Sequence, residues 1–494
     1  MSSTPDSDPT RWSATEIAAA VSDRSVSIPE VLECYLGRVA ETAALNALAW
    51  FDPAEVRKAA STAQARLDDG QTAGLLEGVP FSVKDVITTA GIRTSAGSLA
   101  LRDNIPSRDA TAVARIRRAG GILLGKTNCP EFAFSITTDS PLHGRTTSPW
   151  GSDLSPGGSS GGESALIAAG ASALGLGTDF GGSLRWPAQC TGVLALRPTV
   201  GRVPATGQIP GLGGNVGQED VLPNPATLQG RLQVIGPVAR TVRDLQVGLS
   251  VLSGDDGLDP SCVPSWALPP AREDLRGLHF GWCLDDLETP CGPDVQQMME
   301  TVAAGLRDMG LHDVFRPDLL RGGRERYDRL RDLDALAEIR LAIRGGELLL
   351  STSIRKLLNG PAVVDACELS STWERALNWR ARFQDQLHET PVAIAPVAPG
   401  GATGHDGALF VDGHRLESWD LMAYCRAVSL TGLPVVSIPC ASSMEGLPLS
   451  VQVIGRPFRD DEVLSVARLL EGLFGGARLP PRRDVRSSWG SRSA

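Results

Sequence analysis

The stretch SPGGSSGGESALIAAGASALGLGTDFGGS, residues 155–183, sets out the local order on which the fold depends. It begins as a loop rich in Ser, Gly and Pro. Its Ala-rich middle predicts a short helix over residues 163–169, and an apolar run at residues 173–178 predicts a buried strand. A second loop with two glycines follows the strand. This order indicates an α/β unit in which Ser159 and Ser183 meet at one edge of a sheet.

Strand and helix patterns alternate on both sides of this unit, which predicts an α/β layered fold. Ser13 is a plausible N-cap with Glu16 at the capping-box position, so a helix is expected to begin there. Further helical periodicity covers residues 28–48, 53–67, 110–119 and 462–473. Apolar runs typical of strands lie at residues 78–83, 122–124, 278–283, 392–395, 435–438 and 449–454.

The chain is expected to form one domain, residues 1–494, because both ends contribute strands to the same core and no internal repeat is visible. Its predicted parts are N-terminal helices (11–72), the first part of the core (73–254), an Arg-rich, helical, cap-like segment (255–390), the rest of the core (391–475) and a polar tail (480–494).

Composition excludes several classes of protein. Hydrophobic residues make up 42% of the 494 residues, which suits a sizeable core, and the net charge of −10 argues against a nucleic-acid or anionic membrane surface. No apolar run reaches membrane-spanning length, and the polar N-terminus does not resemble a signal peptide. The nine cysteines are scattered without the spacing of a zinc site or a disulfide framework. We therefore expect a reduced, cytoplasmic protein without metal or cofactor.

The loop around Ser159 has the composition of a backbone-exposing turn. Glycines at 157, 158, 161 and 162 permit backbone conformations closed to other residues and expose N–H groups before a predicted helix. Such a loop could bind phosphate, but the Lys-Ser/Thr pair of a Walker motif is absent. Considered alone, a Gly/Ser run is more often a flexible loop.

The loop ending at Ser183 has the composition of an oxyanion-binding turn. Because Gly181 and Gly182 allow a tight turn, the N–H groups of Phe180, Gly181, Gly182 and Ser183 could converge on one developing negative charge. A serine at the end of such a turn is a sensible nucleophile. An ordinary tight turn explains the same residues equally well when they are taken alone.

Lys84 ends an apolar run, GVPFSVKD at residues 78–85. Only four of the 47 basic residues are lysines (Lys58, Lys84, Lys126 and Lys356), and one of them lies in this predicted strand. At the carboxyl end of its strand, Lys84 can lie at the same sheet edge as the two serine loops. Burial among apolar groups would lower the pKa of its amine, as a base near neutral pH requires.

Taken together, these three segments resemble the amidase signature family. The resemblance is strong over residues 73–252 and 391–470 and weak between them. Further matching motifs, in the same order along the chain, are GKTN (125–128), RWPA (185–188), RPTVGR (197–202), GPVARTVRD (236–244) and TGLP (431–434).

The resemblance implies an α/β/α sandwich with a large mixed central sheet covered by helices on both faces. It also implies a Ser-cisSer-Lys triad, in which Ser183 is the nucleophile, Ser159 follows a cis peptide and relays protons, and Lys84 is the base. The backbone N–H groups of residues 180–183 would form the oxyanion hole, without metal or cofactor. Asp179, Arg185 and Ser160 are expected to support the site.

The expected activity is hydrolysis of a small-molecule carboxylic amide to an acid and an amine or ammonia. Phe180 and the nearby Trp150, Cys129 and Trp186 favour a hydrophobic or aromatic acyl group, and the same route would serve esters or carbamates. No nucleic acid or membrane partner is expected, and a homodimer is compatible with the sequence. Phe180, Trp186 and Cys129 also depart from common family spellings, which leaves the substrate open.

Four other interpretations deserve comparison. The first is the glutaminase (A) subunit of a tRNA-dependent amidotransferase complex, from the same family. The second is an α/β-hydrolase esterase, since residues 157–161 satisfy GxSxG, but no strand is predicted directly before them. The third, an SxxK enzyme using Ser353 and Lys356, would place its motif in a charged helix. The last is a non-catalytic binding protein, against which intact Lys84, Ser159 and Ser183 argue.

Overall fold

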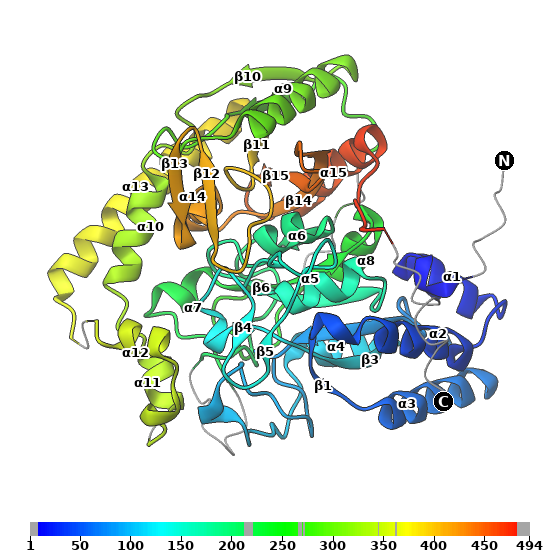
Figure 1. Ribbon diagram of the computed structural model, residues 1–494. Helices are drawn as coiled ribbons and strands as arrows, with labels where there is room; N and C mark the ends of the chain where they lie inside the picture. Colours follow the sequence, from blue (N-terminus) through cyan, green and yellow to red (C-terminus); the bar gives the residue numbers. More distant parts are fainter. Residues whose placement is uncertain are drawn as a thin grey trace, which may run out of the picture.

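The computed structural model describes residues 8–211, 221–264, 269, 272–343, 345–360 and 363–481. Almost all of the predicted polar tail, residues 482–494, and the first seven residues of the polar N-terminus lie outside this range. The described part is built around a mixed sheet of 11 strands that runs through the whole molecule (Figure 1).

The sheet joins strands from every part of the chain. In spatial order they are β1 (Leu48–Phe51), β3 (Ile122–Thr127), β2 (Pro80–Lys84), β6 (Leu174–Asp179), β8 (Val234–Ala239), β7 (Leu194–Arg197), β14 (Val435–Ser442), β15 (Pro448–Gly455), β11 (Val392–Pro396), β9 (His279–Trp282) and β10 (His312–Phe315). The pairs β2–β3, β2–β6, β9–β11 and β9–β10 are parallel, and the other pairs are antiparallel.

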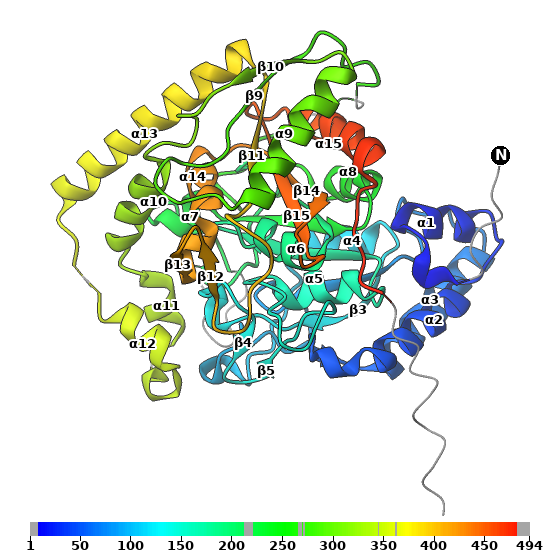
Figure 2. The same cartoon turned by 45° about the horizontal axis from the view of Figure 1, so that its top comes forward.

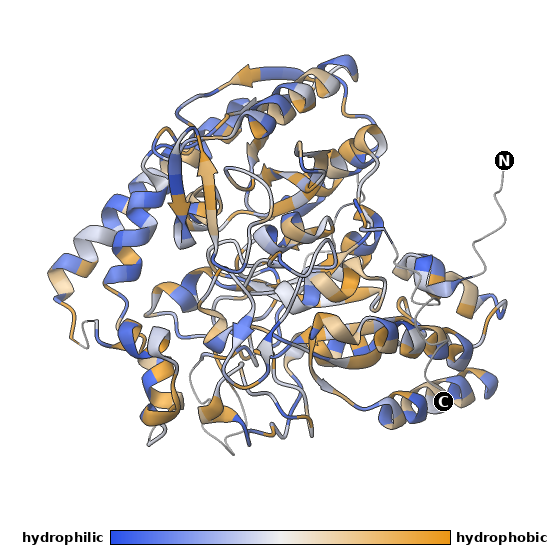
Figure 3. Ribbon diagram, viewed as in Figure 1, coloured by the Kyte–Doolittle hydropathy of each residue, from blue (hydrophilic) through white to orange (hydrophobic). Residues whose placement is uncertain are grey.

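Helices pack on this sheet in two groups. One group, in mutual contact, is α8 (Val242–Leu252), α15 (Asp460–Phe474) and α9 (Pro293–Asp308); the other is α5 (Gly161–Ala168) and α6 (Arg185–Thr191). In Figure 3 apolar residues are frequent in the strands of the sheet, while the outer helices carry hydrophilic and hydrophobic residues side by side. The expected α/β sandwich with a large mixed sheet is confirmed.

The N-terminal helices α1 (Ala14–Ser22), α2 (Ile28–Glu41) and α3 (Pro53–Asp68) pack at the β1 end of the sheet (blue in Figure 1). The predicted capping box is confirmed, since Ser13 and Glu16 bond reciprocally at the start of α1. The helical periodicity expected to continue to residue 48 stops at Glu41, where the chain turns to form β1 at the edge of the sheet.

The segment 255–390 is more than a covering layer, because it also supplies β9 and β10 to the sheet. Its helices α10 (Gly323–Asp332) and α13 (Ala366–Glu389) pack together and against α14 (Ala423–Thr431), as Figure 2 shows. The other α-helices of the described residues are α4 (Thr111–Arg118), α7 (Leu228–Leu232), α11 (Ala337–Ala342) and α12 (Thr352–Leu358). Two hairpins are formed by β4 (Asp139–Ser140) with β5 (Gly144–Arg145) and by β12 (Ala408–Val411) with β13 (His414–Glu417).

Candidate active site

Lys84, Ser159 and Ser183 are brought together by the parallel pairing of β2 with β6. Lys84 is the last residue of β2, and the loop that carries Ser183 follows the end of β6. Ser159 precedes α5, whose chain returns as β6. The two serine loops are joined directly, because the N–H of Ser160 donates to the carbonyl of Ser183 at 3.2 Å. The peptide bond between Gly158 and Ser159 is cis.

Lys84 is fully buried and surrounded by three hydroxyl groups. Its Nζ donates to Oγ of Ser159 at 2.7 Å, to Oγ1 of Thr178 at 2.8 Å and to Oγ of Ser160 at 3.1 Å. A charged ammonium has three protons for these three acceptors, whereas a neutral amine has two protons and one lone pair. In the neutral form one of the hydroxyls must therefore donate to Lys84.

The hydroxyl of Ser160 is committed to a different acceptor. It donates to the carbonyl of Thr178 at 3.2 Å, so its oxygen can only accept a proton from Lys84. This leaves Ser159 or Thr178 to face the lone pair of a neutral Lys84. The arrangement can therefore pass a proton from Ser159 to Lys84.

Burial lowers the pKa of Lys84 to about 8, although Asp179 and Glu163 raise it somewhat through their charge. Lys126 is likewise fully buried, with its pKa lowered to about 8 by burial, and it donates to Oγ1 of Thr89 at 3.0 Å rather than to either serine loop. The other two lysines, Lys58 and Lys356, are exposed. Lys84 is thus an amine that loses its proton readily and touches Ser159.

The turn after β6 presents backbone N–H groups beside Ser183. In the described part of the chain, the N–H groups of Phe180, Gly181 and Ser183 have no backbone or side-chain acceptor. The N–H of Gly182 is already engaged, because it donates to Oδ1 of Asp179 at 2.9 Å. Of the four N–H groups expected to bind an oxyanion, three are unengaged.

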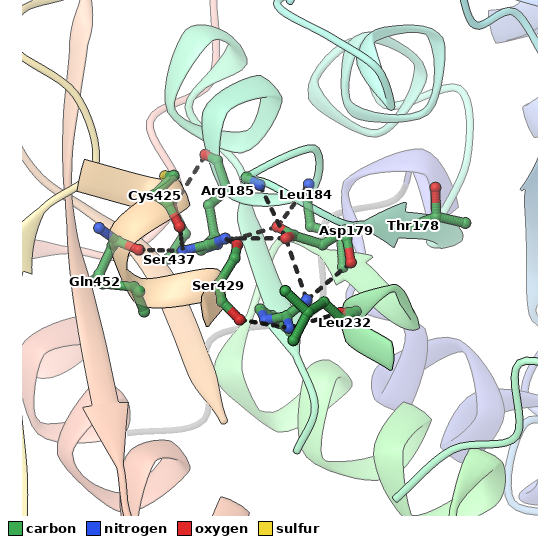
Figure 4. A network of polar contacts seen from close by, with 12 residues as sticks. Thr178, Asp179, Leu184, Arg185, Leu232, Cys425, Ser429, Ser437 and Gln452 are labelled. Carbon is green, nitrogen blue, oxygen red and sulfur yellow. Dashed lines mark hydrogen bonds and ion pairs between the residues drawn. The ribbon is translucent and has the colours of Figure 1, made fainter. Parts of the chain in front are cut away.

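Asp179 holds this turn in place through a network of buried polar contacts (Figure 4). Arg185 forms a bidentate ion pair with its carboxylate, at 2.9 and 3.0 Å, and Arg197 approaches it at 3.3 Å. Burial by itself raises the pKa of the Asp179 carboxyl, but the charges of Arg185 and Arg197 lower it well below its ordinary value. Asp179 is therefore a permanent anion, and with Arg185 it fixes the backbone of residues 182–184.

Glu163, on α5, is a second buried carboxyl beside the site, and sequence reasoning gave it no role. It accepts hydrogen bonds from the hydroxyl of Ser82 and, at 2.9 Å, from that of Thr127. Burial raises its pKa to about 8. A Cβ atom at Gly175 would lie 2.3 Å from its Oε1, so the neighbouring strand has room for this carboxyl only because it carries a glycine there.

Ser159 and Ser183 open into one small pocket, and the Ser183 hydroxyl makes no hydrogen bond with a described residue. The pocket is lined by residues from the core and from the later part of the chain: Ala133, Phe134, Ser159, Thr178, Phe180, Gly181, Ser183, Gln208, Gln229, Gln233, Tyr327, Arg331 and Trp419. Four of these side chains are aromatic. Cys129, Trp150 and Trp186, which were also expected near the substrate, do not line this pocket.

Each of those three residues is engaged away from the serines. Trp186 is buried against Ile136, to whose carbonyl its indole N–H donates at 3.0 Å, and the indole of Trp150 donates to the carbonyl of Thr191 at 2.9 Å. Cys129 is fully buried in the core, and burial raises the pKa of its thiol to about 12. None of them is among the described residues that line the pocket.

Several lining residues were not anticipated. Thr178 lies in the predicted strand at residues 173–178, directly before Asp179. Because side chains alternate between the two faces of a strand, its position next to Lys84 could have been predicted. Tyr327 and Arg331 lie where the sequence matches the family weakly. Trp419 lies in the strongly matching span 391–470, but no local pattern marks any of the three residues. Their position depends on how α10 packs on α14.

Two further properties concern the described residues only. They contain no cluster of three or more His, Cys, Asp or Glu side chains placed to hold a metal ion. None of the helices they form combines the length and the apolar character needed to cross a membrane.

The chain is similar to known proteins over most of its length. A family model described as Amidase matches residues 30–322 and 334–464. Indoleacetamide hydrolase of Bradyrhizobium diazoefficiens is 32% identical, over 94% of this chain and 87% of its own length. The A subunit of the glutamyl-tRNA(Gln) amidotransferase of Roseiflexus castenholzii is 31% identical, over 89% of this chain and 91% of its own length.

Among solved structures, 6-aminohexanoate cyclic dimer hydrolase complexed with substrate superimposes with a TM-score of 0.80 at 26% identity, over 94% of this chain and 98% of its own. The match extends over most of both chains in sequence and in structure. This chain therefore belongs to the amidase signature family and is an amidohydrolase.

Proposed function

We propose that this enzyme cleaves a carboxylic amide through an acyl-enzyme on Ser183, with Ser159 as the proton relay and Lys84 as the base. The observation that carries the proposal is the 2.7 Å contact between Lys84 and Ser159 beside the pocket that Ser183 lines. A buried amine with a pKa near 8 is about one-tenth neutral at pH 7 and half neutral near pH 8, and the neutral form is the one that a general base requires.

In the proposed reaction, Ser183 Oγ attacks the carbonyl carbon while its proton passes to Ser159, whose own proton passes to Lys84. The negative charge on the former carbonyl oxygen is received by the N–H groups of Phe180, Gly181 and Ser183. When the C–N bond breaks, the leaving nitrogen takes a proton from Ser159, which Lys84 replaces. Water then attacks the ester and returns Ser183.

The lining of the pocket supports a hydrophobic or aromatic acyl group. Phe134, Phe180, Tyr327 and Trp419 give it flat apolar walls, and the rings of Phe180 and Tyr327 lie 5.5 Å apart. The acyl group stays on Ser183 after the amine has left, so these walls hold the part of the substrate that remains bound. Esters and carbamates of the same acyl group would follow the same route.

A test of this proposal combines labelling with turnover. A fluorophosphonate probe is expected to label the wild-type enzyme at Ser183, and the Ser183→Ala variant is expected to lose both labelling and amide hydrolysis. Ser164→Ala, at a buried serine on α5, is the matched control that keeps both. Near-wild-type rates in Ser183→Ala would remove Ser183 as the nucleophile.

The second candidate is the glutaminase activity of an amidotransferase (A) subunit, because a protein of that name is 31% identical over most of this chain. Glutamine and phenylacetamide, supplied separately, distinguish the two. Ammonia release from glutamine alone, with copurifying partner subunits, would favour the second candidate.

A further inference from the structure

We infer that Tyr327 and Arg331 form a donor pair on α10 that selects amides whose acyl group ends in a carboxylate. The inference rests on the proposed function, since it names a substrate class for the same pocket. It is carried by two polar groups that line the pocket and form no side-chain hydrogen bond or ion pair within the described part of the protein.

Tyr327 and Arg331 lie four residues apart on α10 (Gly323–Asp332). Residues with this spacing lie one above the other on the same helix face. Both line the pocket that Ser159 and Ser183 share. The helix therefore points a hydroxyl and a guanidinium at the space where the acyl group is proposed to lie.

Two acidic side chains near Arg331, Asp328 and Asp420, form ion pairs with other arginines. Asp328 is bound by Arg426 and approached by Arg324 at 3.6 Å, and Asp420 is bound by Arg324. Among the described residues, the side chain of Arg331 forms neither an ion pair nor a hydrogen bond. Arg331 is thus the arginine of this group that lines the pocket and has no ion-pair partner within the described residues.

Arg331 is nevertheless held in position. The carbon of its guanidinium lies 4.7 Å above the centre of the Trp419 ring. Stacking of this kind fixes the plane of a guanidinium while leaving its N–H edge open. The arrangement matches the two oxygens of a carboxylate, which arginine binds with two parallel hydrogen bonds.

Tyr327 adds a neutral donor beside this charge. Only 2% of the residue is exposed, and its hydroxyl has no hydrogen-bond partner within the residues that the structure describes. Burial raises the pKa of Tyr327, so the hydroxyl keeps its proton and remains a donor. A Cβ atom at Gly181 would lie 2.7 Å from the Tyr327 hydroxyl oxygen. Tyr327 can therefore reach the turn beside Ser183 only because residue 181 is a glycine.

The pocket is small, so an acyl group must contact its lining. The cavity measures about 20 Å³, which is little more than the space of one water molecule. An acyl group that enters must touch or displace lining side chains, and Tyr327 and Arg331 are two of them. A group that ends in a methyl would leave an unpaired guanidinium against apolar surface, whereas a carboxylate would pair it.

The test uses three pairs of amides that differ only at the end far from the amide: succinamate with butanamide, glutaramate with pentanamide, and adipamate with hexanamide. For the best chain length, the wild-type enzyme is expected to favour the carboxylate about ten- to a hundredfold in kcat/KM. Arg331→Gln should reduce this ratio at least tenfold, Arg331→Lys should keep part of it, and Tyr327→Phe should reduce it severalfold.

Arg329→Gln is the matched control, because Arg329 is half exposed on the same helix and pairs with Glu368. It should leave the ratio unchanged. The inference is overturned if no pair favours the carboxylate, or if the preference survives Arg331→Gln. Failure of the proposed function is distinct from this, since the wild-type enzyme would then hydrolyse neither member of any pair and would remain unlabelled at Ser183.

Discussion

Nζ of Lys84 and Oγ of Ser159 lie 2.7 Å apart in a place where Lys84 is 0% and Ser159 1% exposed. Bulk water does not reach Lys84 there, so its amine depends on Ser159, Ser160 and Thr178 for hydrogen bonds. The contact is also made between two distant parts of the chain, the end of a strand and the loop before a helix. Proton transfer and the packing of β2 against α5 are consequently linked.

The rate of amide hydrolysis should rise with pH as Lys84 loses its proton. Because burial lowers the pKa of this amine to about 8, kcat/KM for a neutral amide is expected to reach half its maximum near pH 8. A profile between pH 6 and 10 checks this. In Lys84→Arg the guanidinium stays charged, so activity should be lost throughout. A flat wild-type profile would contradict lysine as the base.

Replacing Lys84 by Met should stabilise the protein while abolishing its activity. The folded state holds the proton of Lys84 with a pKa near 8, below the value of about 10.4 expected in the unfolded chain. Between those values the unfolded state binds more protons, so the free energy of unfolding rises with pH and is lowest below pH 8.

The full shift of the Lys84 pKa corresponds to about 3 kcal/mol at pH 7. The loss of the hydrogen bonds from Lys84 to three hydroxyl groups cancels a part of this gain. Urea unfolding at pH 7 should therefore show a gain of about 1–2 kcal/mol in Lys84→Met. Lys356→Met, at an exposed lysine, should leave the free energy of unfolding unchanged. A Lys84→Met protein that is less stable than the wild type would show that burying the protonated amine of Lys84 does not destabilise the folded state.

Ser160 and Thr178 should act by orienting the lone pair of Lys84. Since the proton of Ser160 is committed to the Thr178 carbonyl, Ser160→Ala removes an acceptor and lets the amine turn away from Ser159. We expect kcat to fall about ten- to a hundredfold in Ser160→Ala and in Thr178→Val. Thr191→Val, at a buried threonine on α6, is the control. Equal rates in all three would exclude the orienting role.

Glu163→Gln should move the pH profile toward acid. A charged Glu163 favours the protonated form of Lys84, so its removal lowers the pKa of the amine further. The midpoint of kcat/KM should shift down, while Asp244→Asn, at a buried carboxyl on α8 that binds the N-terminal helix, should leave it in place. A midpoint that stays near pH 8 in Glu163→Gln would show that the two groups are not coupled.

Asp179→Asn should be among the most destabilising single changes. It leaves the buried guanidinium groups of Arg185 and Arg197 without a counter-charge, which typically costs about 3–5 kcal/mol. Thermal and urea unfolding measure this loss, with the surface substitution Asp139→Asn expected to stay within about 0.5 kcal/mol. Loss of less than about 1 kcal/mol would mean that Asp179 does not balance the two arginines.

Much of the fold follows from local patterns. Apolar runs located β2, β6, β11, β14 and β15, and the order of loop, helix and strand over residues 155–183 placed Ser159 and Ser183 at one edge of the sheet. These patterns are informative because strands buried on both faces consist almost entirely of apolar residues. The short edge strand β1 was missed because its four residues are only half-buried and directly follow a helical pattern.

The wall of the pocket could not be predicted in this way. Tyr327 and Arg331 lie on a helix whose sequence is mostly charged, and only its packing against α14 turns one face toward Ser183. Trp150 and Trp186 were expected in the pocket because they are near the serine loops in sequence. Sequence proximity failed there because α6 turns Trp186 toward Ile136 and away from the serines.

The scarcity of lysines and the burial of two of them have a practical consequence. Amine-reactive reagents applied to the folded protein should modify Lys58 and Lys356 and spare Lys84 and Lys126. Such reagents would attach the enzyme to a solid support through these two side chains and the α-amino group of the chain, without touching the amine beside Ser159. Mass spectrometry of the modified protein would also reveal unfolding, as two additional lysines become reactive.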